Sequence, residues 1–81
     1  MHVMKMTEYF KFMHRKPDRQ LIKPKWIESV INEPEFAEVQ DDGRIRLWRK
    51  IPEYGNRYLR VILLSDRETV HNAFFDRGFN K

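Results

Sequence analysis

Residues 57–64, Arg-Tyr-Leu-Arg-Val-Ile-Leu-Leu, decide the fold of this chain of 81 residues. Four polar residues follow at 65–68, and a second run rich in β-branched and aromatic side chains occupies 69–75. Two such runs joined by a short polar break predict an antiparallel β-hairpin. The first run is too apolar for an edge strand with one face in water. We therefore expect it in the middle of a sheet, with other elements packed on it.

Two further strands are predicted upstream of this hairpin. Residues 36–40 form a weak strand pattern, and residues 44–51 alternate almost perfectly between polar and apolar side chains. Asp42-Gly43 lies between them and predicts a two-residue turn, because glycine accepts the positive φ that a type I′ turn requires. Residues 52–56 predict the next turn. Since short connections favour pairing in sequence order, the four strands are expected to form a meander.

The first third of the chain has helical periodicity instead. Apolar residues three and four apart predict an amphipathic helix over 7–15, with Thr7 as its N-cap: Met6, Tyr9, Phe10 and Met13. A strand is the alternative, because the run is short and aromatic. Residues 16–19 predict a turn. Pro24 then suits the first position of a second helix, over 24–32, whose apolar side is formed by Trp26, Ile27, Val30 and Ile31.

Helices followed by strands are typical of an α+β domain. We expect a single domain, with two N-terminal helices packed on one face of a four-stranded antiparallel meander. A tail is expected at 76–81, with Phe79 packed back onto the sheet and an Asp76–Arg77 ion pair tying it down. Because the helices can cover only one face, the other face is expected to be free for function.

Composition excludes several classes of site. The chain has no cysteine, and its three histidines, His2, His14 and His71, are too scattered to suggest a metal cluster, so we expect neither metal nor cofactor. Glycine-rich phosphate loops, zinc-binding spacings and hydrolase triads are missing. No run approaches the roughly 18–20 apolar residues of a membrane span, and the N-terminus lacks the apolar region of a signal peptide. A cytoplasmic protein is expected.

Charge and alternation together point to nucleic acid. The net charge is +4 and the pI is near 9.6, which is compatible with such a partner. Alternation gathers basic and aromatic side chains on the face away from the helices: Arg44, Arg46, Trp48, Lys50, Tyr58 and Arg60. Guanidinium groups bind phosphates and aromatic rings stack on unpaired bases, so this face suits RNA. The alternative is an ordinary solvated face, with Glu38 or Glu68 neutralising the arginines.

The last strand fits two registers, in which either Val70, Asn72 and Phe74 or His71, Ala73 and Phe75 face the helices. We favour Val70 and Phe74 inward, which turns His71 towards Arg60 and Trp48. A histidine there could act as general base and acid, with Arg60 or Arg46 stabilising the charge that develops on phosphorus. The alternative is a histidine that makes one structural hydrogen bond.

The final hairpin, Arg57-Tyr-Leu-Arg-Val-Ile with Thr69-Val-His-Asn-Ala-Phe-Phe-Asp-Arg77, resembles the RelE/ParE-like superfamily of bacterial toxins. The resemblance extends to the small basic chain and its N-terminal helices, and it is closest to the BrnT-like branch and to related short families of unassigned function. The spacing of His14, Arg15, Arg19, Ile22, Trp26–Ile31 and Pro34 is similar to those short families. Ribosome-dependent members end in a basic, tyrosine-bearing segment, where this chain has Phe74-Phe-Asp-Arg77.

The resemblance implies an RNA-binding surface and metal-independent cleavage, in which a 2′-hydroxyl attacks the adjacent phosphate. Arg46 and Arg60 would hold the phosphate, Tyr58 or Trp48 would stack on a base, and His71 would move the proton. A toxin of this kind would also need an antitoxin-like protein. The alternative function is a non-catalytic module that binds a protein or a nucleic acid. No pattern in the chain predicts its oligomeric state.

Overall fold

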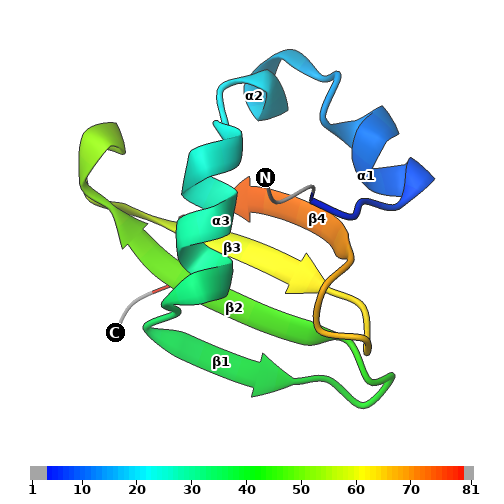
Figure 1. Cartoon of the computed structure of the whole chain (residues 1–81). Helices are drawn as coiled ribbons and strands as arrows, with labels where there is room; N and C mark the ends of the chain where they lie inside the picture. The colour runs from blue at the N-terminus through cyan, green and yellow to red at the C-terminus, as the bar shows by residue number, and fades with distance from the viewer. Residues whose placement is uncertain (1–3, 80–81) are drawn as a thin grey trace.

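Four antiparallel strands form one sheet in sequence order: β1 (Phe36–Val39), β2 (Ile45–Ile51), β3 (Arg57–Leu63) and β4 (Val70–Phe75) (Figure 1). The computed structural model describes residues 4–79. The α+β class, the four strands and their order agree with the sequence prediction, and each strand is one residue shorter than expected. The apolar run 57–64 supplies β3, a central strand between β2 and β4.

Three short helices precede the sheet, where two were predicted: α1 (Glu8–Met13), α2 (Pro17–Gln20) and α3 (Pro24–Asn32). The hydroxyl of Thr7 accepts a hydrogen bond from the N–H of Phe10 at 3.0 Å, so the predicted N-cap is confirmed. The predicted turn at 16–19 is wrong, because Pro17 begins a single helical turn there. Proline favours this position because its fixed φ suits the first turn and its missing N–H is not needed.

Helix α3 supplies most of the helical part of the core. It packs against β2 and β3, and it buries Trp26, Ile27 and Val30. Helix α1 instead contacts the edge strand β4. The predicted apolar side of α1 is only partly right, because Phe10 is buried whereas Tyr9 is 47% exposed. A helix at the edge of the sheet has less apolar surface to cover than one across its centre.

The turn between β1 and β2 has three residues, 41–43, and not the predicted two. The N–H of Gly43 donates to the carbonyl of Gln40 at 2.9 Å, and the N–H of Gln40 donates to Arg44 at 2.7 Å. Only Gly43 in this loop has a positive φ, +89°. A type I′ turn needs two such residues, so the loop is a type I turn closed by a glycine bulge.

A β-bulge in β4 changes the predicted orientation of its side chains. Leu63 pairs with Val70 and Ile62 pairs with Asn72, which leaves His71 as an extra residue between the two pairs. As a result Val70 and Ala73 are buried towards the helices, whereas Phe74 lies opposite Arg60 on the other side. The prediction that Phe74 faces the helices is therefore wrong, because the inserted residue shifts the alternation.

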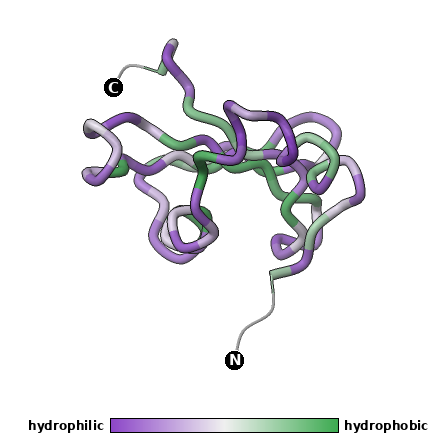
Figure 2. Tube along the Cα trace, turned by 90° about the horizontal axis from the view of Figure 1, so that it is seen from above, coloured by the Kyte–Doolittle hydropathy of each residue, from purple (hydrophilic) through white to green (hydrophobic). Residues whose placement is uncertain are grey.

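The C-terminal segment folds back over the face of the sheet that the helices leave open. In Figure 2 the helical coils lie on one side of the sheet and the segment leading to the C-terminus lies on the other. The ring of Phe79 stacks on Trp48 with centroids 4.8 Å apart and planes 16° apart. Packing of Phe79 on the sheet is thus confirmed, and residues 80 and 81 of the predicted tail lie outside the described residues.

Candidate nucleic-acid interface

Strands β2 and β3 bring the predicted basic and aromatic residues together. Trp48 lies directly opposite Arg60, and Lys50 lies opposite Tyr58. The guanidinium of Arg60 sits over the indole of Trp48, 5.4 Å from its centroid, and the ammonium of Lys50 is 5.8 Å from the ring centroid of Tyr58. Arg46 follows on the same face, two residues before Trp48. The spatial cluster that alternation predicts is therefore present.

The rings of this face are already occupied by the chain itself. Besides Trp48, the ring of Phe79 contacts Tyr58 at 5.0 Å and Phe36 at 5.2 Å, both edge to face. Trp48 is consequently only 7% exposed. An indole covered in this way offers no face on which a base could stack while the C-terminal segment is in place.

Carboxylates neutralise the arginines of the same face. Asp76 accepts a hydrogen bond from the indole N–H of Trp48 at 3.1 Å and pairs with Arg60 at 3.4 Å. Arg46 pairs with Glu38 at 3.0 Å. The expected Asp76–Arg77 pair is replaced by Asp76–Arg60, because the backbone after β4 turns towards the sheet.

Two further ion pairs involve residues that were named in the sequence prediction. Arg44 pairs with Asp42, 3.7 Å away in the hairpin loop. Glu68, which was considered as a neutralising partner for the arginines, pairs instead with Lys5 at 3.3 Å. Each of the three arginines predicted on the nucleic-acid-binding face, Arg44, Arg46 and Arg60, therefore has an acidic neighbour.

His71 lies apart from the proposed catalytic arginines. Its Nδ1 is 3.2 Å from the hydroxyl oxygen of Thr7, and its ring stacks on Tyr9 with centroids 4.9 Å apart. Burial, followed by the positive charge of Arg44, lowers the pKa of His71 from its ordinary value of 6.5. Because the bulge turns this side chain towards α1, the described contacts of His71 include neither Arg46 nor Arg60. The catalytic role of His71, Arg46 and Arg60 stays a prediction.

A different basic and aromatic surface lies on α1 and the turn that follows it. Phe12 is 64% exposed at the centre of the solvent-facing side of α1, one helical turn from Tyr9. Three exposed cations, Lys11, Arg15 and Lys16, lie close to these rings in the chain, and Lys11 pairs with Glu8 at 3.2 Å. We call the two rings and the three cations the α1 surface. The segment 1–25 that contains them carries seven basic and two acidic residues.

The α1 surface was not predicted from the sequence, because Tyr9 was expected in the core. A usable signal was present: Phe12 lies nearly opposite Phe10 around a helix, and Lys16 follows Phe12 at the i+4 position. Stacking on His71 holds Tyr9 in place, so the ring is ordered although it is half exposed. Ordered rings beside cations can stack on unpaired bases and attract phosphates.

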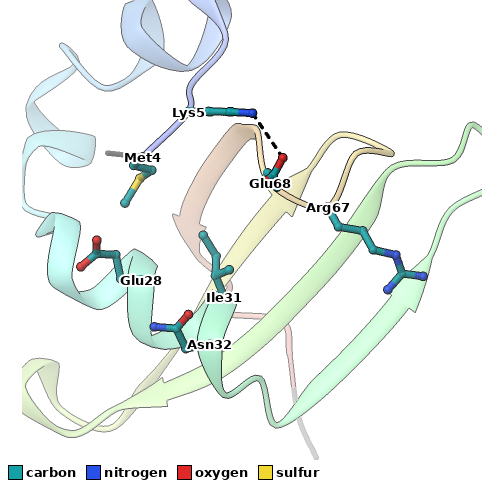
Figure 3. A pocket seen from close by; sticks show the side chains of 7 residues that line it. All are labelled: Met4, Lys5, Glu28, Ile31, Asn32, Arg67 and Glu68. Atoms are coloured by element: carbon teal, nitrogen blue, oxygen red, sulfur yellow. Dashed lines mark hydrogen bonds and ion pairs between the residues drawn. The ribbon is translucent and has the colours of Figure 1, made fainter. Parts of the chain in front are cut away.

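A separate hollow of about 400 Å³ lies between α3 and the β3–β4 turn (Figure 3). Its lining contains the exposed Lys5–Glu68 ion pair and the apolar side chains of Met4 and Ile31. None of the predicted site residues lines it. Within residues 4–79, no group of three or more histidine or acidic side chains is placed to hold a metal ion, and no helix is long and apolar enough to cross a membrane.

Comparison of the chain with protein-family models, with curated proteins and with solved structures finds no match.

Proposed function

We propose that this chain binds single-stranded RNA without cleaving it, and that the α1 surface makes the contact. The observation that carries the proposal is the exposure of Phe12, a large aromatic ring 64% open to solvent, with cations close to it in the chain. A ring this open is accessible to a partner, and bases stack on aromatic faces irrespective of sequence. The surplus of positive charge in residues 1–25 supports a phosphate backbone as that partner.

Cleavage, as the resemblance to RelE-like toxins implies, needs a proton-transfer group beside a phosphate-binding arginine. The separation of His71 from Arg46 and Arg60, and the carboxylates on both arginines, support binding over catalysis. The sheet face remains the alternative location for RNA, and using it would require displacement of Phe79 from Trp48.

The test is a titration of fluorescein-labelled oligouridine, followed by fluorescence anisotropy over a series of salt concentrations. We expect Phe12→Ala to weaken binding roughly tenfold, because each stacked base contributes about 1–3 kcal/mol. Lys16→Gln should make the slope of log K against log salt concentration shallower by about 0.7. This is the value for the loss of one phosphate contact on a single strand.

Lys50→Gln is the matched control for Lys16→Gln, because both lysines are exposed and Lys50 belongs to the sheet face. If Lys50→Gln weakens binding and Phe12→Ala does not, RNA lies on the sheet face and the proposal is wrong. Lack of binding by the wild type at low salt also overturns it. Incubation of the labelled RNA in a metal chelator tests cleavage: a fragment with a 5′-hydroxyl end, lost in His71→Ala, would restore the enzyme hypothesis.

A further inference from the structure

The two edges of the sheet differ in how their backbone groups are satisfied. At β4, the N–H of Val70 donates to the carbonyl of Lys5 at 2.8 Å, and the N–H of Thr7 donates to the carbonyl of Val70 at 3.0 Å. Further along, Arg19 donates to the carbonyl of Ala73 at 3.3 Å. The N-terminal segment and α2 therefore close much of the β4 edge.

The β1 edge is open. The hydrogen bond from Gln40 to Arg44 fixes the alternation along β1, so the N–H and C=O groups of Glu38 point towards β2 and those of Ala37 and Val39 point away from it. No residue in the range 4–79 is positioned as a further strand beside them. An unpaired row of this kind is a template for another strand.

The side chains of the same two residues add apolar surface. Val39 is 63% exposed and lies opposite Ile45 in the register, on the side of the sheet that faces the helices. Helix α3 packs on β2 and β3 and leaves Ala37 and Val39 exposed. A strand added to β1 could cover these apolar groups with every second side chain.

The charge around β1 indicates which kind of strand could pair with this edge. Residues 26–43 contain six acidic side chains and no basic one: Glu28, Glu33, Glu35, Glu38, Asp41 and Asp42. Two of them share their charge with arginines of the neighbouring hairpin arm, since Glu38 pairs with Arg46 and Asp42 pairs with Arg44, so the segment keeps a surplus of acidic charge. A hollow of about 470 Å³ lies along the end of β1, and its lining contains three carboxylates and one guanidinium: Glu38, Asp41, Asp42 and Arg46. Pairing of β1 with β1 of a second copy would bring two such acidic sets together, and like charges across a strand pair are destabilising. A basic strand has the complementary charge.

We propose that β1 accepts an extended basic segment of another protein as a fifth strand of the sheet. Lysine or arginine at alternate positions of that segment would face Glu38, and the apolar residues between them would cover Val39. Main-chain hydrogen bonds to Ala37 and Val39 would provide affinity, and the alternating side chains would provide specificity. The site is independent of the α1 surface and of the RNA proposal.

The probe is a synthetic peptide that alternates lysine and valine, titrated into the full chain and followed by backbone amide NMR. We expect shifts centred on 36–42, and protection of the Val39 N–H from solvent exchange. Val39→Pro removes an outward donor without removing a bond to β2, and it should weaken binding by about fivefold to tenfold, the effect of one lost hydrogen bond. Asp41→Lys should weaken it by about fivefold.

Glu53→Lys is the control for Asp41→Lys, because it makes the same charge change at an exposed position beyond the other end of β2. Its affinity for the peptide should equal that of the wild type. The proposal is overturned if the peptide does not bind, if it binds Val39→Pro as tightly as the wild type, or if the shifts centre on α1. It is also overturned if sedimentation shows a dimer that Val39→Pro dissociates, because β1 would then pair with a second copy. If Asp41→Lys weakens binding and Val39→Pro does not, strand addition is refuted, because the contact would then be purely electrostatic.

Discussion

Truncation of Phe79 tests whether the C-terminal segment stabilises the fold. The ring contacts Phe36, Trp48 and Tyr58, with centroid distances between 4.8 and 5.2 Å, and it is itself partly buried. A fully buried phenylalanine loses about 3–5 kcal/mol on truncation to alanine. Because Phe79 retains part of its exposure, we expect Phe79→Ala to reduce the free energy of unfolding by about 2 kcal/mol.

Equilibrium unfolding in urea, followed by tryptophan fluorescence, measures this loss. For a domain of this size about 2 kcal/mol corresponds to a fall in Tm of about 8–16 °C. The variant should also increase quenching of tryptophan fluorescence by acrylamide, because Trp48 loses the ring that covers it. Trp26 contacts Tyr54 and Phe75 and makes no ring contact with Phe79, so its accessibility should not change.

Phe12→Ala is the matched control, since the same truncation at a ring 64% exposed should change stability by less than about 0.5 kcal/mol. A loss for Phe79→Ala as small as the one expected for Phe12→Ala would refute the reasoning, because the C-terminal segment would then contribute little to the stability of the folded state. The same result would leave the face around Trp48 open to ligands.

Two titrations test the electrostatics. A hydrogen bond from the Thr69 hydroxyl, followed by those from the N–H groups of Thr69 and Glu68, lowers the pKa of Asp66 from 3.8 to about 2. The ionised Asp66 therefore contributes its full stabilisation above pH 3.8, and this contribution is lost as the pH falls towards 2. Thr69→Val should raise the Asp66 pKa towards its ordinary value in a carboxyl NMR titration, and an unchanged midpoint would contradict the assigned cause. Burial and the charge of Arg44 lower the pKa of His71 from 6.5. Because the folded state disfavours the protonated imidazole, the contribution of His71 to the free energy of unfolding should be full above pH 6.5 and should decline as the pH falls through the lowered pKa. Proton NMR of the imidazole checks this: Arg44→Gln should raise the midpoint, and a wild-type midpoint at or above 6.5 would be incompatible with the described surroundings.

The composition of the sheet face was predictable because strand alternation is a local property, whereas the α1 surface was not predicted. Alternation predicts that Trp48, Lys50, Tyr58 and Arg60 share one face. The register that places Trp48 opposite Arg60 and Lys50 opposite Tyr58 comes from the structure. The acidic partner of Arg60 was not predictable. Asp76 is close to Arg77 in sequence, yet it pairs with Arg60, since the path of the chain after β4 decides which cation it meets.

The sequence by itself determined the α+β class, the four strands in order and the buried run of β3, because hydrophobic periodicity and turn residues act over a few neighbours. Only the tertiary structure decided which surfaces remain open. The bulge at His71 turned that side chain towards α1, the return of Phe79 covered Trp48, and the position of α1 at the sheet edge left Phe12 in solvent. Each of these outcomes depends on contacts between segments far apart in the chain, which local periodicity does not encode.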